Sequence, residues 1–226
     1  MATKRIYISG GSKGGVGKSF LTMALLDRLT ETGEKVLLIE SDTSNPDVWK
    51  AYKDVTETVL LNLDEADGWI ELLNVCEAQP DSTVVINTAA RNNVGVSAYG
   101  ATLNNTLEEL QRELVTLWCI NRQRDGLELL KAFMDAIPAS VVHVVRNGYF
   151  GPEAKFELYN GSKVRKEVEA RGGKSLLLPD LADRVADELY SKRLSIAAAA
   201  KQMPIGNRAE LQRWRTEVGK MLGDVV

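Results

Sequence analysis

The chain has 226 residues, of which 44% are hydrophobic and 26% are charged, and its formal net charge is −3. These values exclude a disordered chain, and a chain of this length can bury a core without disulfides or a structural metal. Two cysteines, Cys76 and Cys119, are too few for a zinc ribbon or a disulfide framework. The slightly acidic balance argues against a surface uniformly coated for nucleic acid, although it allows a local basic patch.

The sequence contains no segment that would span a membrane. Its apolar runs fall short of the ~18 residues that a spanning helix needs, and the N-terminal residues turn to glycine before a signal-peptide core could form. We therefore expect a protein of the reducing cytoplasm, folded as a single domain over residues 1–226.

Short β-rich runs alternate with longer helical patterns along the chain. The short runs are nearly continuous in apolar residues, as in parallel strands covered on both faces. Apolar residues repeat at helical spacing from Phe20 to Leu29 and from Leu127 to Met134. This alternation predicts an α/β fold with a doubly wound, mostly parallel sheet flanked by helices. The predicted strands are Arg5–Ser9, Lys35–Glu40, Val59–Asn62, Thr83–Asn87, Val115–Asn121, Val141–Arg146 and Ser175–Leu178.

A glycine-rich loop follows the first predicted strand, at the sheet edge where ligands of doubly wound folds bind. It reads GGSKGGVGKS over residues 10–19 and runs into the first helix. Backbone N–H groups of such a loop surround a phosphate, Lys18 would reach the β and γ phosphates, and Ser19 would ligate Mg²⁺. The strict Walker pattern requires glycine where Ser12 stands, so the pattern matched is KGGxGKS. The alternative is a glycine-rich turn that only joins a strand to a helix. Seven motif positions match between a predicted strand and a predicted helix, which disfavours that alternative.

This loop resembles the deviant Walker A motif of the ParA/MinD ATPases, which are P-loop NTPases. In that family an additional early lysine, here Lys13, reaches across to a nucleotide bound by a second subunit. The resemblance implies catalytic roles for Lys13 and Lys18 and a site for ATP or ADP. The nucleotide-binding residues that it implies in and beside the loop are Gly14, Gly15, Val16, Gly17, Lys18, Ser19 and Phe20.

Two acidic residues end the second predicted strand, which reads VLLIESDT over residues 36–43. The family has D-x-D here, and its second aspartate positions the attacking water. Asp42 matches that aspartate, which implies a catalytic and Mg²⁺-binding role. Glu40 replaces the first aspartate and moves the charge out by one methylene. A solvated strand end with two acids is the alternative, and for Glu40 it is left open.

Asn87 stands where the family has the Walker B aspartate, which holds Mg²⁺ through water. The surrounding run, TVVINTAA over residues 83–90, is otherwise close to the family pattern of an apolar strand followed by D-T-P-A. An amide accepts a hydrogen bond from metal-bound water but carries no charge. Hydrogen bonds to charged groups are worth about 1.5–3 kcal/mol, so we expect metal affinity or hydrolysis to fall by roughly one to two orders of magnitude. Glu40 is the candidate to compensate at this metal site.

Two segments fall where ParA-like proteins bind adenine. The guanine-reading tetrapeptide N-K-x-D does not occur in the sequence. Instead, Asn147 follows a late strand and Pro179 follows the last one, as the resemblance requires for base contacts. Asn147 is followed by glycine, so an ordinary turn residue is the alternative. His143 lies inside an apolar strand, where we expect a buried structural histidine.

Three further segments carry charge or an apolar stripe. The segment WCINRQRD at residues 118–125 holds two arginines, which would contact phosphate or a partner subunit. The alternative is an ordinary polar loop in which Asp125 is the N-cap of the next helix. Basic residues between Lys163 and Lys174 alternate with glutamates, which is typical of a solvated face; direct contact with DNA is left open. The stripe from Leu211 to Val225 favours a helix packed on its own sheet over membrane contact.

Residues 146–182 and the segment PIGNR at 204–208 are similar to the plasmid-encoded MobD/StbB subgroup. The resemblance implies an ATP-binding dimerisation switch in plasmid stability, partition or conjugative transfer. Such a switch would hydrolyse ATP slowly under stimulation by a small DNA-binding partner, in the cytoplasm and in association with the nucleoid. A non-hydrolysing ATP-binding scaffold for a DNA-bound plasmid complex is the alternative, for which Asn87 is the sign. A small-molecule kinase or ligase is disfavoured, because Lys13 has no evident role in a substrate pocket.

Overall fold

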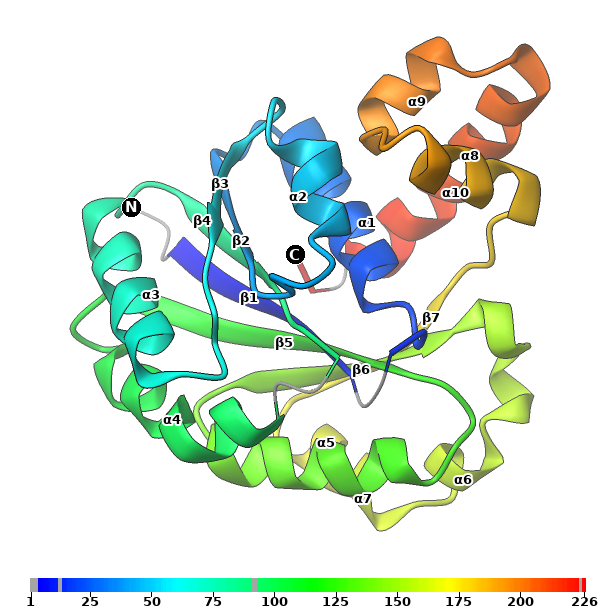
Figure 1. Ribbon diagram of the computed structural model, residues 1–226. Helices are drawn as coiled ribbons and strands as arrows, with labels where there is room; N and C mark the ends of the chain where they lie inside the picture. The colour runs from blue at the N-terminus through cyan, green and yellow to red at the C-terminus, as the bar shows by residue number, and fades with distance from the viewer. Residues whose placement is uncertain (1–3, 12–13, 91–92, 224) are drawn as a thin grey trace.

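The fold is built around one parallel sheet, shown in Figure 1. The computed structural model describes residues 4–11, 14–90, 93–223 and 225–226. Seven strands lie in the order β3-β2-β4-β1-β5-β6-β7, and all neighbouring pairs are parallel. The strands are β1 (Lys4–Gly11), β2 (Val36–Glu40), β3 (Glu57–Leu60), β4 (Thr83–Asn87), β5 (Arg112–Ile120), β6 (Val141–Asn147) and β7 (Ser175–Leu178).

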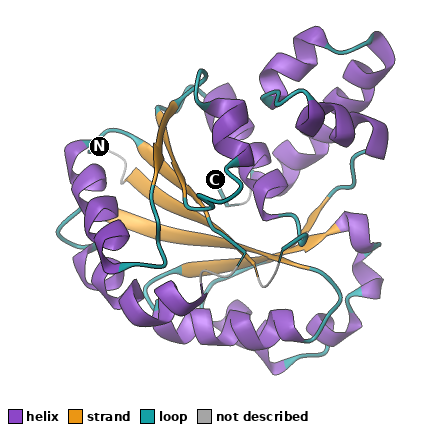
Figure 2. Cartoon of the chain, in the orientation of Figure 1, coloured by secondary structure: helices purple, strands orange, loops and turns teal. Residues whose placement is uncertain are grey.

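Helices cover both faces of this sheet, as Figure 2 shows by colour. One face is covered by α1, α2 and α8 to α10, and the other by α3 to α7. Two short 3₁₀ helices, η1 (Gly148–Phe150) and η2 (Glu153–Lys155), follow β6. The α-helices are α1 (Lys18–Glu31), α2 (Asp47–Tyr52), α3 (Ala66–Ala78), α4 (Asn93–Thr106), α5 (Asp125–Ala136), α6 (Glu157–Asn160), α7 (Lys163–Ala170), α8 (Asp183–Ser191), α9 (Ile196–Gln202) and α10 (Ile205–Leu222).

The apolar runs predicted as strands form strands because both of their faces are buried. In β1, Ile6 and Ile8 pack into one layer and Tyr7 packs into the other. The predicted α/β fold with a doubly wound parallel sheet is therefore confirmed. The third strand was misplaced by two residues, since it runs from Glu57 rather than Val59. It is an edge strand that pairs only with β2, and its weak burial leaves little apolar pattern to mark its ends.

The C-terminal stripe is buried, as expected of a helix packed on its own protein. Trp214 and Leu222 of α10 are fully buried in the same core as α1 and β7. The helix begins at Ile205, six residues before Leu211, the first residue of the stripe. In the described part of the chain, no helix is long and apolar enough to cross a membrane.

Candidate nucleotide-binding site

The phosphate loop lies at the carboxyl end of β1, the middle strand of the sheet. Gly14 and Gly15 are exposed, whereas Val16 is buried beneath them. Gly15 and Gly17 have φ angles of 76° and 106°, which favour glycine. A Cβ on Gly17 would lie 2.4 Å from Asn147 Nδ2, so this position has no room for a side chain. The loop is thus a backbone cradle, open on its outer side, at the start of α1.

Lys18, at the first position of α1, is buried under the loop. Its carbonyl accepts hydrogen bonds from Ser9 Oγ at 3.0 Å and from Thr22 Oγ1 at 3.0 Å, which fix the first turn of the helix on β1. Burial lowers the pKa of the Lys18 ammonium, while the nearby carboxylate of Asp42 opposes that shift. Ser19 is half-buried beside it. A buried cation at a helix N-terminus favours an anion in the cradle.

Phe20 and Lys13 complete the set of residues predicted in and beside the loop. Phe20 is half-buried in the first turn of α1, directly after Ser19. Lys13, which the family resemblance assigns to a second subunit's nucleotide, lies outside the described residues.

Asn147, at the end of β6, supports the phosphate loop from below. Its Nδ2 donates to the carbonyl of Val16 at 2.9 Å, and its Oδ1 accepts from the backbone N–H of Tyr149 at 3.1 Å. The Cys119 thiol donates to the same Val16 carbonyl at 3.0 Å. The sequence did not indicate this supporting role, because it depends on β6 and β5 lying next to the loop. The contact of Asn147 with adenine stays a prediction.

The two segments expected to bind the base lie side by side. Asn147 is in register with Leu178, the residue before Pro179. A Cβ on Gly148 would lie 2.5 Å from the carbonyl oxygen of Leu178, so the backbones after β6 and β7 are in close contact. Pro179 is half-buried, and its carbonyl accepts from the indole N–H of Trp214 at 2.8 Å.

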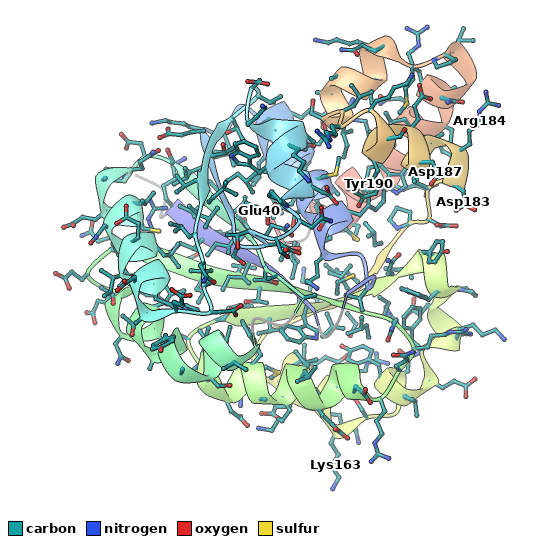
Figure 3. The ribbon with its side chains drawn as sticks, viewed as in Figure 1. Glu40, Lys163, Asp183, Arg184, Asp187 and Tyr190 are labelled. Atoms are coloured by element: carbon teal, nitrogen blue, oxygen red, sulfur yellow. The ribbon has the colours of Figure 1, made fainter. Side chains whose placement is uncertain are left out.

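Glu40 and Asn87 form a buried pair at the ends of β2 and β4. Glu40, labelled in Figure 3, is fully buried. Its Oε1 accepts from Asn87 Nδ2 at 2.9 Å and from the backbone N–H of Asp42 at 3.0 Å, and its Oε2 accepts from the N–H of Trp49 at 3.3 Å. Burial raises the pKa of the Glu40 carboxyl to about 7, against the effect of these donors. Thr22 Oγ1 lies 2.9 Å from Asn87 Oδ1, so its one proton is shared between this oxygen and the carbonyl of Lys18.

This network explains the additional methylene of Glu40. The longer side chain reaches the N–H of Trp49 in α2 and the backbone of Asp42, so it orders the segment between β2 and α2. The interpretation of Glu40 as a solvated strand end is wrong, because the side chain is fully buried. Asp42 itself is half-buried, and its Oδ1 accepts from Ser44 Oγ at 2.7 Å and from the N–H of Asn45 at 3.0 Å.

A model of the CobQ/CobB/MinD/ParA nucleotide-binding domain matches residues 8–148. These residues include the phosphate loop, Glu40, Asp42, Asn87 and Asn147. The chain belongs to this family. It is also 71% identical to protein MobD of Acidithiobacillus ferrooxidans over 223 residues, which cover 99% of this chain and 98% of that protein.

Solved structures of MinD share the fold at low sequence identity. The cell division ATPase MinD of Pyrococcus furiosus aligns with a TM-score of 0.57 and 16% identity over 98% of this chain and 99% of its own. The septum site-determining protein MinD of Pyrococcus horikoshii, complexed with Mg-ADP, aligns with a TM-score of 0.57 and 16% identity over 96% and 95% of the two chains. The predicted ParA/MinD resemblance is thereby confirmed at the level of family and fold.

The family site of this chain therefore combines four strand ends. The loop after β1 would hold phosphate, and the ends of β2 and β4 bring Glu40, Asp42 and Asn87 beside it. Asn147, the last residue of β6, supports the loop from below. Ser19, Asp42, Glu40 and Asn87 are the predicted Mg²⁺ site. Both carboxylate oxygens of Glu40 already accept hydrogen bonds from N–H groups. Glu40 would therefore contact a metal through a water molecule, or it would bind the metal directly and lose one of these hydrogen bonds.

The other sequence predictions fall outside this site. His143 is buried, and its Nδ1 accepts from the backbone N–H of Lys174 at 3.0 Å, which confirms a structural role. Asp125 is the first residue of α5 rather than its N-cap, which is Arg124. On α7, Arg165 pairs with Glu169 at 2.8 Å, one turn away, as expected of a solvated helix face.

Proposed function

We propose that the chain is an ATP-binding switch of the ParA type that dimerises on ATP and acts in plasmid mobilisation or maintenance. The observation that carries the proposal is the glycine cradle over buried Lys18, with the ordered loop of Glu40 and Asp42 beside it. A cradle of this kind fits the β and γ phosphates of a nucleotide, and its lysine fits their charge. The geometry therefore supports nucleoside triphosphate as the ligand.

The residues at the edge of the cradle define what the chain would do to a bound nucleotide. Ser19 and Asp42 would hold Mg²⁺, with Asn87 and Glu40 behind them, and the ion would neutralise charge on the β and γ phosphates. Asp42 would orient the attacking water. Phosphoryl transfer of this type depends on positioning and charge neutralisation, and the uncharged Asn87 supports slow turnover by the chain alone.

The dimer and its partners extend the proposal beyond the cradle. By the family resemblance, Lys13 of one subunit would contact the nucleotide of the other, so that ATP joins two copies and hydrolysis separates them. The likeness to protein MobD supports a plasmid role. By the family resemblance, a small DNA-binding protein would be the partner that stimulates turnover. Association with DNA would then be direct or through that partner.

Nucleotide titration of Lys18→Ala tests the proposal. We expect the natural chain to bind ATP and ADP in the presence of Mg²⁺ and Lys18→Ala to lose at least about tenfold in affinity. Lys35→Ala is the matched control, since Lys35 is exposed before β2, at the opposite edge of the sheet. Equal ATP binding by all three proteins would refute the assigned site.

A second candidate function, an ATP-holding scaffold that does not hydrolyse, is favoured by one observation. Asn87 stands where the family has a charged aspartate, and its uncharged amide is held between Thr22 and Glu40. The protein would be loaded with ATP–Mg²⁺, left for several hours and then made to release its nucleotide. The identity of that nucleotide distinguishes the slow ATPase from the scaffold. ADP indicates the slow ATPase, whereas intact ATP indicates the scaffold.

A further inference from the structure

Trp214 of α10 connects the two ends of the nucleotide site. Its indole N–H donates to the carbonyl of Pro179, the segment expected to meet the base, at 2.8 Å. Its ring lies 4.9 Å from the ring of Phe20, the residue after Ser19, at an angle of 38°. Tyr190 of α8, labelled in Figure 3, lies 6.4 Å from Phe20 on the same side of the sheet. One fully buried side chain thus touches both the base segment and the phosphate-binding helix.

Two neighbours of Trp214 hold the same base segment. Arg213 Nη2 donates to the carbonyl of Asp180 at 3.2 Å, and Glu210 Oε1 accepts from the N–H of Ala182 at 3.5 Å. Arg213 and Trp214 follow Glu210 by three and four residues on α10, so each of them lies beside Glu210 on the helix surface. The backbone from Pro179 to Ala182 is therefore fixed by three side chains of a single helix.

A buried ion pair holds α10 itself against α1. Arg215 Nε lies 2.7 Å from Asp27 Oδ2, and Arg215 Nη2 lies 3.1 Å from Asp27 Oδ1. The side chains of Arg215 and Asp27 are only 16% and 7% exposed. Two parallel bonds of this kind fix orientation as well as distance. The base segment is thus positioned relative to the phosphate-binding helix through α10.

We propose that Trp214, assisted by Arg213, is a positioning residue for the nucleotide base. The inference rests on the proposed function, because it takes residues 179–182 as the base-binding segment. Trp214 touches Phe20 and the base segment, whereas Lys18 and the glycine cradle receive the phosphates. Loss of its N–H should therefore weaken binding of a nucleotide and leave binding of a bare phosphate chain unchanged.

Calorimetric titration of Trp214→Phe with ATP and with inorganic tripolyphosphate, both with Mg²⁺, tests the proposal. Phenylalanine keeps a ring against Phe20 but cannot donate to Pro179. We expect a roughly three- to tenfold loss of ATP affinity, the range of one neutral hydrogen bond, with tripolyphosphate affinity changed less than about twofold. Arg213→Gln, at a half-exposed position, should give the same pattern more weakly.

Trp69→Phe is the matched control on the other face of the sheet. Trp69 is also buried, and its indole N–H also donates to a backbone carbonyl, that of Leu63, at 2.8 Å. The two variants should lose similar stability, but Trp69→Phe should keep the ATP affinity of the natural chain.

Three results separate the possible failures. Equal losses for ATP and tripolyphosphate in Trp214→Phe would overturn the positioning role, because α10 would then support the whole site and not its base segment. An unchanged ATP affinity in both Trp214→Phe and Arg213→Gln, with binding still lost in Lys18→Ala, would also overturn it and leave the proposed function intact. Unchanged ATP binding in Lys18→Ala would refute the proposed function itself.

Discussion

Glu40 and Asn87 face each other in register at the ends of β2 and β4, and the Asn87 amide donates to the Glu40 carboxylate at 2.9 Å. The resembled ParA/MinD pattern has aspartate at both positions. This chain keeps one carboxylate of the two and uses an amide donor to stabilise it. The acidic side chain of this pair thus lies on β2, where it also orders the loop that carries Asp42.

Asn87→Asp should restore the family charge at a cost in stability. The new carboxylate would replace an N–H donor about 3 Å from Glu40, so the metal-free protein should lose roughly 1–3 kcal/mol of unfolding free energy. Bound Mg²⁺ would offset that repulsion, and Mg²⁺-dependent ATP turnover should rise about tenfold or more. Thermal unfolding with and without Mg²⁺, beside a phosphate-release assay, measures both effects.

The double variant Asn87→Asp with Glu40→Gln is the control for this prediction. It again pairs a carboxylate with an amide, in reversed order, and should recover part of the stability lost in Asn87→Asp. Recovery should be partial, because the glutamine NH₂ that faces the new aspartate cannot accept the N–H of Asp42. Unchanged turnover in Asn87→Asp would show that Asn87 does not limit hydrolysis.

Gly17→Ala should lose nucleotide affinity through a contact that the sequence motif alone does not reveal. A methyl group at Gly17 would collide with Asn147 Nδ2, which supports Val16. Gly33→Ala is the matched control, since Gly33 also has a positive φ, 81°, but nothing lies within 4 Å of its added Cβ. Both should lose about 1 kcal/mol of stability from backbone strain, and Gly17→Ala should lose more because its methyl group also displaces Asn147.

Only Gly17→Ala should weaken ATP binding, by about tenfold or more, as measured by fluorescence or calorimetric titration. A similar loss in Gly33→Ala would show that helix strain, and not the contact with Asn147, controls the loop.

His143 should make folding stability fall in acid. Burial, with the nearby charges of Lys174 and Arg5, lowers the pKa of its imidazole to about 4. The unfolded chain, with an ordinary pKa of about 6.5, binds the proton first, so stability is complete above pH 6.5 and is lost as the pH falls toward 4. From about pH 7.5 to about pH 5 the loss should be about 2 kcal/mol.

Because His143 is the chain's single histidine, its imidazole resonance can be titrated without assignment. Urea unfolding of the natural chain and of His143→Gln at both pH values isolates its contribution. An imidazole that titrates near pH 6.5 in the folded protein would contradict the prediction.

Local sequence was sufficient to predict the strands and the phosphate loop. The apolar run ending at Asn87 and the glycines before Lys18 are contiguous patterns that need no tertiary information. The edge strand β3 was misplaced because only one side of it is paired and its side chains are partly exposed.

Contacts between distant segments could not be predicted in this way. Asn147 lies 131 residues from its partner Val16, and Arg215 lies 188 residues from Asp27. Such pairs depend on which strands become neighbours and on how α10 returns to α1. Single residues such as Trp214 carry no signal for this role in the sequence, because a buried tryptophan on an amphipathic helix fits any packed core.

The central claim, an ATP-dependent dimer, is tested most directly by molar mass from light scattering. The natural chain and Lys13→Ala would be measured without nucleotide, with ADP–Mg²⁺ and with ATP–Mg²⁺. The account predicts a doubling of mass with ATP–Mg²⁺ only, which Lys13→Ala abolishes while it still binds ATP. A mass that does not change although ATP is bound would contradict the switch and favour the scaffold.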